Sequence, residues 1–187
     1  TLNSTQFEAL EDTELLFNLD ANDDDGDALT ISLINQPQQG TLDTSGSQWV
    51  YKANENFHGD DNFTVTINDE QTSSDPIEVN IKILPVNDAP NAQNDTFELD
   101  YTPSGEYRLS VLANDQDVDE DTLSLVSAES SLGTVEIDNE ALLLTLNSGV
   151  TGDIHLSYFI VDPDGENSQA EVNLQIDPYD EDLPTLT

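Results

Sequence analysis

The sequence predicts an all-β protein that consists of two tandem seven-stranded antiparallel β-sandwiches. Two observations support this prediction. Apolar residues alternate with polar ones in many short segments, and Asp, Asn, Gly and Ser separate these segments. One set of motifs also occurs twice, about 93 residues apart, so the chain holds two copies of one module. No segment shows the i, i+3, i+4, i+7 spacing of an amphipathic helix.

The alternating segments locate the strands. In the first copy, Leu29, Ile31 and Leu33 alternate with polar neighbours, and the apolar residues of 63–67 and 77–83 do the same. In chain order we expect strands near residues 4–8, 14–20, 28–35, 40–43, 48–53, 62–69 and 77–84. The second copy repeats the pattern in segments 107–111, 142–146 and 156–160.

The repeat also divides the chain. Ala21-Asn22-Asp23 recurs as Ala113-Asn114-Asp115, and the later motifs recur at nearly the same offset. Only the acidic loop changes length, by two residues. We therefore expect one module over residues 1–90 and a second over residues 91–187, which ends in an acidic segment, with the boundary near Pro90.

The composition excludes several classes of function. Of the 187 residues, 40 are Asp or Glu and three are Lys or Arg, which gives a net charge of −37. A nucleic-acid-binding protein needs basic residues on its surface, and so does a protein attracted to anionic lipid. The longest apolar run is far shorter than the ~20 residues of a membrane span. Cysteine is absent, so disulfides and thiolate metal centres are excluded. We expect divalent cations to neutralise part of the charge.

The carboxylates cluster in one loop of each copy, 23–27 in the first and 115–121 in the second. Alternate carboxylates in such a loop can converge on Ca²⁺, which takes six to eight oxygen ligands at about 2.3–2.6 Å. Neither the EF-hand frame nor the Gly-rich nonapeptide of calcium-binding β-helices is present. The alternative is a solvated acidic turn of a halophilic or marine protein. Two loops at matching positions favour calcium.

Strand geometry places further acids near these loops. Asp61 and Asp69 bracket one predicted strand, about 26 Å apart at 3.3 Å per residue, and so belong to opposite poles of the sandwich. Counting the strands up and down places loop 21–27 with Asp69 at one pole. The other pole of the first module lies next to the linker and is expected to face the acidic loop of the second module. Acids from both modules would then meet at one junction.

Several motifs of the first copy occur in a fixed order: Glu11, the Ala21-Asn22-Asp23 loop, NFHGDDNF at 56–63, Asp69 and VNDAP at 86–90. Together they resemble the cadherin repeat, and more closely the cadherin-like tandem repeat of giant bacterial RTX-type adhesins. This resemblance implies a Greek-key, cadherin/Ig-like sandwich. It also implies that calcium ions between modules stiffen a long extracellular rod at the cell surface.

The resemblance implies a set of calcium ligands as well. At the junction, the ligands from the first copy would be Glu11, Asp61, Asn87 and Asp88, and those from the second would be Asp115, Asp117 and Asp162. A matching site at the other pole of the first copy would use Asp23, Asp25, Asp27 and Asp69. The second copy departs from the family pattern, because it has Glu98 and Asp100 where a Glu-Asp-Thr motif is expected.

We therefore expect a non-enzymatic extender segment of a large extracellular adhesin, whose partners are neighbouring repeats of the same chain joined by Ca²⁺. The sequence has no G-x-S-x-G elbow and no HExxH motif. His58 and His155 are expected to be a loop and a strand histidine. Two alternatives remain open. Trp49 and Tyr51 share a strand face and would bind a polysaccharide in a calcium-dependent module, although burial in the core is favoured. The other alternative is homophilic adhesion to another copy.

Overall fold

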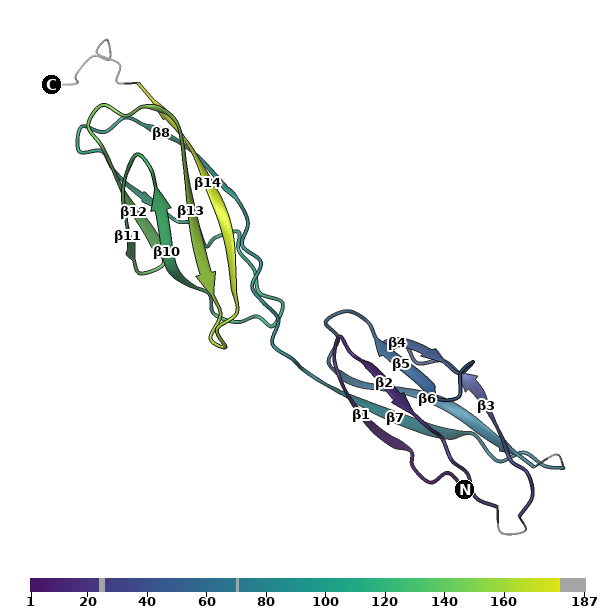
Figure 1. The fold of residues 1–187 in the computed structure, drawn as a ribbon. Helices are drawn as coiled ribbons and strands as arrows, with labels where there is room; N and C mark the ends of the chain where they lie inside the picture. The colour runs from purple at the N-terminus through teal and green to yellow at the C-terminus, as the bar shows by residue number, and fades with distance from the viewer. Residues whose placement is uncertain (24–25, 70, 179–187) are drawn as a thin grey trace. The chain divides into compact units, whose positions relative to one another are not determined.

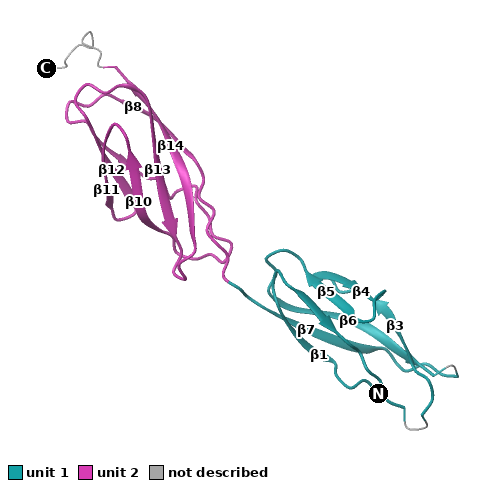
Figure 2. Ribbon diagram, viewed as in Figure 1, with its two compact units in different colours: residues 1–86 teal, residues 87–187 magenta. Residues whose placement is uncertain are grey.

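The computed structural model of the protein describes residues 1–23, 26–69 and 71–178 (Figure 1). In this part of the chain the regular elements are all strands, so no helix is available to cross a membrane. The chain divides into two compact units, residues 1–86 and residues 87–187 (Figure 2). Each unit contributes one four-stranded and one three-stranded sheet, and the predicted fold class of two seven-stranded β-sandwiches is confirmed.

Unit 1 begins with a strand that lies beside its last strand. Its elements are β1 (Gln6–Leu10), β2 (Glu14–Phe17), β3 (Thr30–Asn35), β4 (Gly40–Asp43), β5 (Trp49–Ala53), β6 (Gly59–Asn68) and β7 (Ile77–Leu84). The strand orders are β1-β7-β6-β3 and β2-β5-β4. β1 runs parallel to β7, and the remaining pairs are antiparallel. Successive strands change sheets except at β4–β5 and β6–β7, as the Greek-key prediction requires.

Unit 2 repeats this topology. Its elements are β8 (Asp95–Asp100), β9 (Glu106–Leu109), β10 (Ser124–Ser130), β11 (Gly133–Asp138), β12 (Ala141–Leu146), β13 (Gly152–Val161) and β14 (Asn167–Asp177). The strand orders are β10-β13-β14-β8 and β11-β12-β9, and β8 is parallel to β14. In both units the chain therefore enters at one end of the parallel strand pair and leaves at the other end.

The alternation of apolar and polar residues produces the two cores. In unit 1, Phe63 and Val65 of β6 are fully buried, as are Val79 and Ile81 of β7. Several predicted boundaries move by two or three residues, and β2, for example, ends at Phe17 rather than near residue 20. β1 begins two residues later than expected, and β6 begins at Gly59 rather than near residue 62, because the residues before Asn62 extend the ladder with β7.

Trp49 belongs to the core of unit 1. Its ring centroid lies 5.7 Å from that of Phe63 and 6.2 Å from that of Phe17, which also packs at 4.5 Å from Phe7. Tyr51, two residues on, is fully buried. Aromatic pairs at these separations stabilise a core. The structure therefore favours packing over a sugar-stacking platform at these two residues.

Two glycines lie at equivalent positions where neighbouring backbone leaves no room for a side chain. Gly40 begins β4 and Gly133 begins β11. A Cβ atom would lie 2.5 Å from the carbonyl oxygen of Lys52 at Gly40, and 2.2 Å from that of Thr145 at Gly133. Real Cβ atoms do not approach backbone so closely, so both positions require glycine for close strand approach.

We predict that Gly133→Ala lowers the free energy of unfolding of unit 2 by about 1–3 kcal/mol, because the added methyl forces the backbone of two paired strands apart. Urea unfolding of the whole chain measures the effect. Gly46→Ala is the control, since a Cβ there would meet nothing closer than 3.3 Å. Equal losses for both variants would show that close approach is not the constraint at Gly133.

Candidate functional site

Glu11 is a buried carboxylate at the end of unit 1 from which the chain leaves. It follows β1 and is 1% exposed. One carboxylate oxygen accepts the backbone N–H of Val86 at 2.6 Å, and the other lies 3.6 Å from Nδ1 of His58. Burial of a carboxylate is costly unless donors or a positive charge compensate it. Glu11 therefore ties the β1–β2 loop to the residue that precedes the linker, and it offers a negative charge there.

Asp61 lies away from Glu11, although both residues were predicted as ligands at the junction. Asp61 pairs with Ile81 of β7, whereas Glu11 follows the Leu10–Leu84 pair, which lies about 10 Å further along the strand. Asp61 is 4% exposed, and each of its oxygens accepts two hydrogen bonds. The donors are the backbone N–H groups of Gln38, Gln39 and Asn62 and the hydroxyl of Tyr51, at 2.8–3.0 Å.

This arrangement makes Asp61 a structural carboxylate. It holds the β3–β4 connection and the hydroxyl of Tyr51 inside unit 1. Burial first, and the hydrogen bond and charge of Asp61 next, raise the pKa of Tyr51. Sequence reasoning missed this role because a motif match does not show whether a side chain points inward. The structure gives no support to Asp61 as a calcium ligand.

The acidic loop of unit 2 is organised by Asp117. One oxygen of its carboxylate accepts the backbone N–H of Asp119 at 2.9 Å and that of Asp121 at 3.5 Å. Between them, Glu120 adopts a φ of 62°, which is unusual for glutamate. The second oxygen of Asp117 is buried and accepts no hydrogen bond from the described residues. A buried oxygen of this kind requires a partner, either an ordered water or a cation.

The first residues of unit 2 bind to the same region. The Nδ2 of Asn87 donates to one oxygen of Asp162 at 2.8 Å, and the N–H of Asp88 donates to Asp119 at 2.8 Å. Carboxylate oxygens of Asp88 and Asp119 lie within 4.8 Å of each other. The hydrogen bond from Asn87, supported by the N–H groups of Gly165 and Glu166, holds the pKa of Asp162 below its usual value.

These side chains form a negatively charged cluster at the end where the chain enters unit 2. Burial raises the pKa of Asp121, and the charges of nearby aspartates raise it further; these neighbours are Asp117, Asp164, Asp119 and Asp162. Across the described residues, carboxylates are paired with a basic side chain in two places, His58 with Glu11 and Arg108 with Asp138.

The cluster includes the predicted Asp117 and Asp162, and also Asp119, Asp121 and Asp164, which were not predicted as ligands. The D-x-D-x-D spacing of 117–121 is the signal that would have found two of them.

Asp115 points away from this cluster, toward the core of unit 2. Its carboxylate accepts the N–H of Gln93 at 2.7 Å and lies 3.0 and 3.1 Å from the hydroxyl of Tyr158. The same hydroxyl is 3.1 Å from Asp95. Burial is the main cause that raises the pKa of Asp115, and it raises the pKa of Asp95 to about 6. Burial and the two carboxylates also raise the pKa of Tyr158.

The predicted second site lies at the end of unit 1 where the chain begins. Asp23 and Asp69 line one cavity of about 280 Å³. The N–H of Asp27 donates to Asp23 at 3.2 Å, so Asp27 lies beside it. Hydrogen bonds from Thr72 and Gln71 hold the pKa of Asp69 below its usual value. Asp25 lies outside the described residues.

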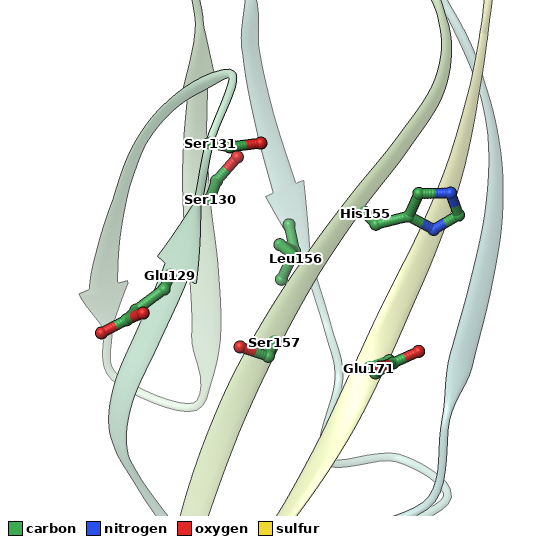
Figure 3. Close-up of a pocket in the computed structure, with 7 residues that line it drawn as sticks. All are labelled: Glu129, Ser130, Ser131, His155, Leu156, Ser157 and Glu171. Atoms are coloured by element: carbon green, nitrogen blue, oxygen red, sulfur yellow. The ribbon is translucent and has the colours of Figure 1, made fainter.

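Residues of β10, β13 and β14 and of the turn after β10 line a depression of about 420 Å³ (Figure 3). Its lining residues are Glu129, Ser130, Ser131, His155, Leu156, Ser157 and Glu171. The Nδ1 of His155 lies 2.5 Å from the side-chain oxygen of Asn173 on β14. His155 is thus the predicted strand histidine, and His58 lies in the predicted loop before β6.

A family model described as Bacterial Ig domain matches residues 1–82 and 87–175, which covers both units. The chain belongs to the bacterial Ig domain family. Unit 1 is its first Ig domain and unit 2 its second. No curated protein matches the sequence significantly.

The Ig domain pair is similar in fold to cadherin ectodomains. It matches human mucin-like protocadherin EC1-2 with a TM-score of 0.58 at 17% identity, over 96% of this chain and 98% of that one. For human CDH23 EC21-23 the TM-score is 0.57 at 16% identity, over 97% and 79%. For the human Desmocollin-1 ectodomain it is 0.54 at 13% identity, over 100% and 42%. These similarities establish the cadherin-like sandwich that the sequence predicted.

We predict that Asp61→Asn lowers the free energy of unfolding of the first Ig domain by about 1–3 kcal/mol, because an amide cannot accept all four hydrogen bonds and leaves buried donors unpaired. Chemical denaturation in EDTA measures the loss. The exposed neighbour Asp60→Asn removes the same charge and is expected to change the stability little. Comparable effects of the two substitutions would contradict the structural role of Asp61.

We predict that the second Ig domain becomes more stable as the pH falls from 6 toward 4. The pKa of Asp95 is about 6 in the folded domain and near 3.8 when exposed, so the folded state binds the proton more tightly in this window. Above the folded pKa, both states are ionised and the cost of burying the charge is fully present. Calorimetry in EDTA compares the native chain with Asp95→Asn.

The native chain is expected to gain stability relative to Asp95→Asn over this pH window. Asp100→Asn, an exposed position on the same strand, is the control and should follow the native pH profile. Parallel profiles for the native chain and Asp95→Asn would show that Asp95 has an ordinary pKa in the folded domain.

Proposed function

We propose that the chain is a calcium-stiffened, non-enzymatic extender segment of a large extracellular adhesin of the RTX type, at the cell surface. One observation carries the proposal. The end of the second Ig domain where the chain enters holds several aspartates without basic partners, and a buried oxygen of Asp117 accepts no hydrogen bond from the described residues. Such an oxygen-only, negatively charged cluster suits a hard divalent cation.

The residues present fit Ca²⁺ better than a transition metal. The donor set is made of carboxylate and amide oxygens, and histidine and cysteine ligands are absent from the acidic loop. We propose Asp117, Asp119 and Asp162 as ligands of the second domain, with Asn87 and Asp88 from the linker. Each of the linker residues already binds an aspartate of this set.

Glu11 completes the proposed junction from the first domain. Its carboxylate accepts the N–H of Val86, and the next residue, Asn87, is bound to Asp162. An ion that binds acids on both sides of this peptide bond would remove the mutual repulsion of the two domains and limit the motion of the linker. The proposed function is therefore to stiffen the chain, and Ca²⁺ supplies the positive charge that the sequence lacks.

A second proposed site would serve a repeat that precedes the first domain. Asp23, Asp27 and Asp69 are its described members, and Asp23 and Asp69 line one cavity. Extracellular calcium modules bind with dissociation constants of about 10⁻⁴–10⁻³ M. At ten to a hundred times that value, each ion would stabilise the folded chain by about 1.4–2.7 kcal/mol.

We predict that millimolar Ca²⁺ raises the Tm of the chain and narrows its range of dimensions in small-angle scattering, relative to EDTA at equal ionic strength. Asp119→Asn and Glu11→Gln should reduce both effects, because each removes a proposed ligand. Asp153→Asn is the matched control, since it removes one exposed charge on β13. If Tm and scattering are the same with Ca²⁺ and with EDTA, the proposed function is wrong.

A further inference from the structure

We propose that Asp115 is a positioning residue, held inside the second domain by Tyr158 and Asp95, and that the ligand series of the acidic loop begins at Asp117. The inference rests on the proposed calcium function, and it changes the role that the sequence motif gives to Asp115. Three observations support it: the backbone register of the two loops, the surroundings of the Asp115 carboxylate, and the residues that replace these groups in the first domain.

The backbone register differs from the motif alignment. In the first domain, the N–H of Asn22 donates to the carbonyl of Thr1 at 2.9 Å, and the amino group of Thr1 donates back to Asn22 at 2.8 Å. In the second domain, Asn91 and Gln116 exchange the same two hydrogen bonds at 2.7 and 3.2 Å. Gln116 is therefore the structural counterpart of Asn22, although the Ala-Asn-Asp motif assigns that place to Asn114.

The loops that follow confirm this register. In 23–27 and in 117–121, the side chain of the first aspartate accepts the N–H of the fifth residue, at 3.2 and 3.5 Å respectively. The fourth residue has a positive φ in both loops, 81° and 62°. The two loops thus share these two features, and Asp117 is the counterpart of Asp23. The two extra residues of the second domain lie before Asp117.

In this register the counterpart of Asp115 is Ala21, which has no carboxylate. The hydroxyl of Tyr158, which contacts Asp115, also has no counterpart, because the repeat places the buried Val65 there. Asp95 lies opposite Val172, and the residue in the corresponding place of the first domain is a threonine, Thr5. The contact set of Asp95, Asp115 and Tyr158 therefore belongs to the second domain alone.

The contacts of Asp115 hold its side chain in place, so that it can act as an anchor for the start of the acidic loop. Its carboxylate accepts an N–H from Gln93 and faces the hydroxyl of Tyr158, whose side chain is fully buried in β13. Asp115 directly precedes Gln116, whose backbone is bound to Asn91. Side chain and backbone together fix the start of the acidic loop, one residue before the first proposed ligand.

The longer loop explains why the second domain needs such an anchor. The β9–β10 connection has two more residues than the β2–β3 connection, both of them before Asp117, and a longer segment loses more conformational entropy when it is held in place. Holding the first residues of the loop in place lowers that loss. The second domain thereby keeps Asp117 and Asp121 in the relation that Asp23 and Asp27 have in the first, with a longer chain segment before them.

Calcium titrations of the full chain test the inference through the number of ions bound and their affinity. Tyr158→Phe and Asp115→Asn are each expected to leave the number of bound ions unchanged and to weaken calcium binding about tenfold. Removing a residue that orients metal ligands without binding the metal has an effect of this size. The double variant should bind no more weakly than either single variant, because both changes break one contact. Asp117→Asn should instead lose one ion.

Two further variants separate positioning from general stability. Tyr107→Phe removes another buried tyrosine hydroxyl of the second domain, which accepts the N–H of Thr102 at the opposite end, and should leave calcium binding unchanged. The triple variant Asp95→Thr, Asp115→Ala, Tyr158→Val installs the residues of the first domain, which folds with them. It should keep the full number of ions.

Hydrogen exchange in EDTA tests the anchor without calcium. Tyr158→Phe should speed the exchange of the Gln116 amide, and Tyr107→Phe should not. Loss of one ion in Asp115→Asn, or unchanged affinity and exchange in Tyr158→Phe, would overturn the inference while leaving the proposed function intact. A native chain that binds no Ca²⁺ would overturn the proposed function directly, before any variant is compared.

Discussion

A buried carboxylate must be compensated by hydrogen-bond donors or by a cation, and this chain supplies few cations of its own. Glu11, Asp61, Asp95 and Asp162 are all buried, while the sequence has three Lys and Arg residues. Backbone N–H groups and tyrosine hydroxyls compensate Asp61 and Asp95. At the acidic loop of the second Ig domain, one buried oxygen of Asp117 receives no hydrogen bond from the described residues, and the proposed cation would compensate this charge.

The two domains compensate their buried carboxylates with different residues. The first buries Tyr51 against Asp61, and the repeat replaces this pair with Leu144 and Ile154 in the second. The second buries Tyr158 against Asp95 and Asp115, where the first has Val65. Each of these polar sets lies near the linker side of its own domain.

The strands could be predicted from the sequence because their apolar residues alternate and are buried in turn, as in β6 and β13. The candidate site could be predicted only in part. Glu11, Asn87 and Asp162 were predicted as ligands from motif position, and that role stays a prediction, although each makes a side-chain hydrogen bond within its own domain. Asp61 and Asp115 share the same motifs, yet their side chains turn inward to a tyrosine. Two extra loop residues also shift the backbone register against the motif, and the sequence alignment does not show where they are inserted.

The parallel pairing of the first and last strands has a mechanical consequence. In each domain, the chain enters along β1 or β8 and leaves along the adjacent β7 or β14, in the same direction. A force that pulls on the two chain ends therefore loads this strand pair in shear, and its hydrogen bonds must break together rather than one after another. Tension along the chain would be carried by the backbone hydrogen bonds within these two strand pairs.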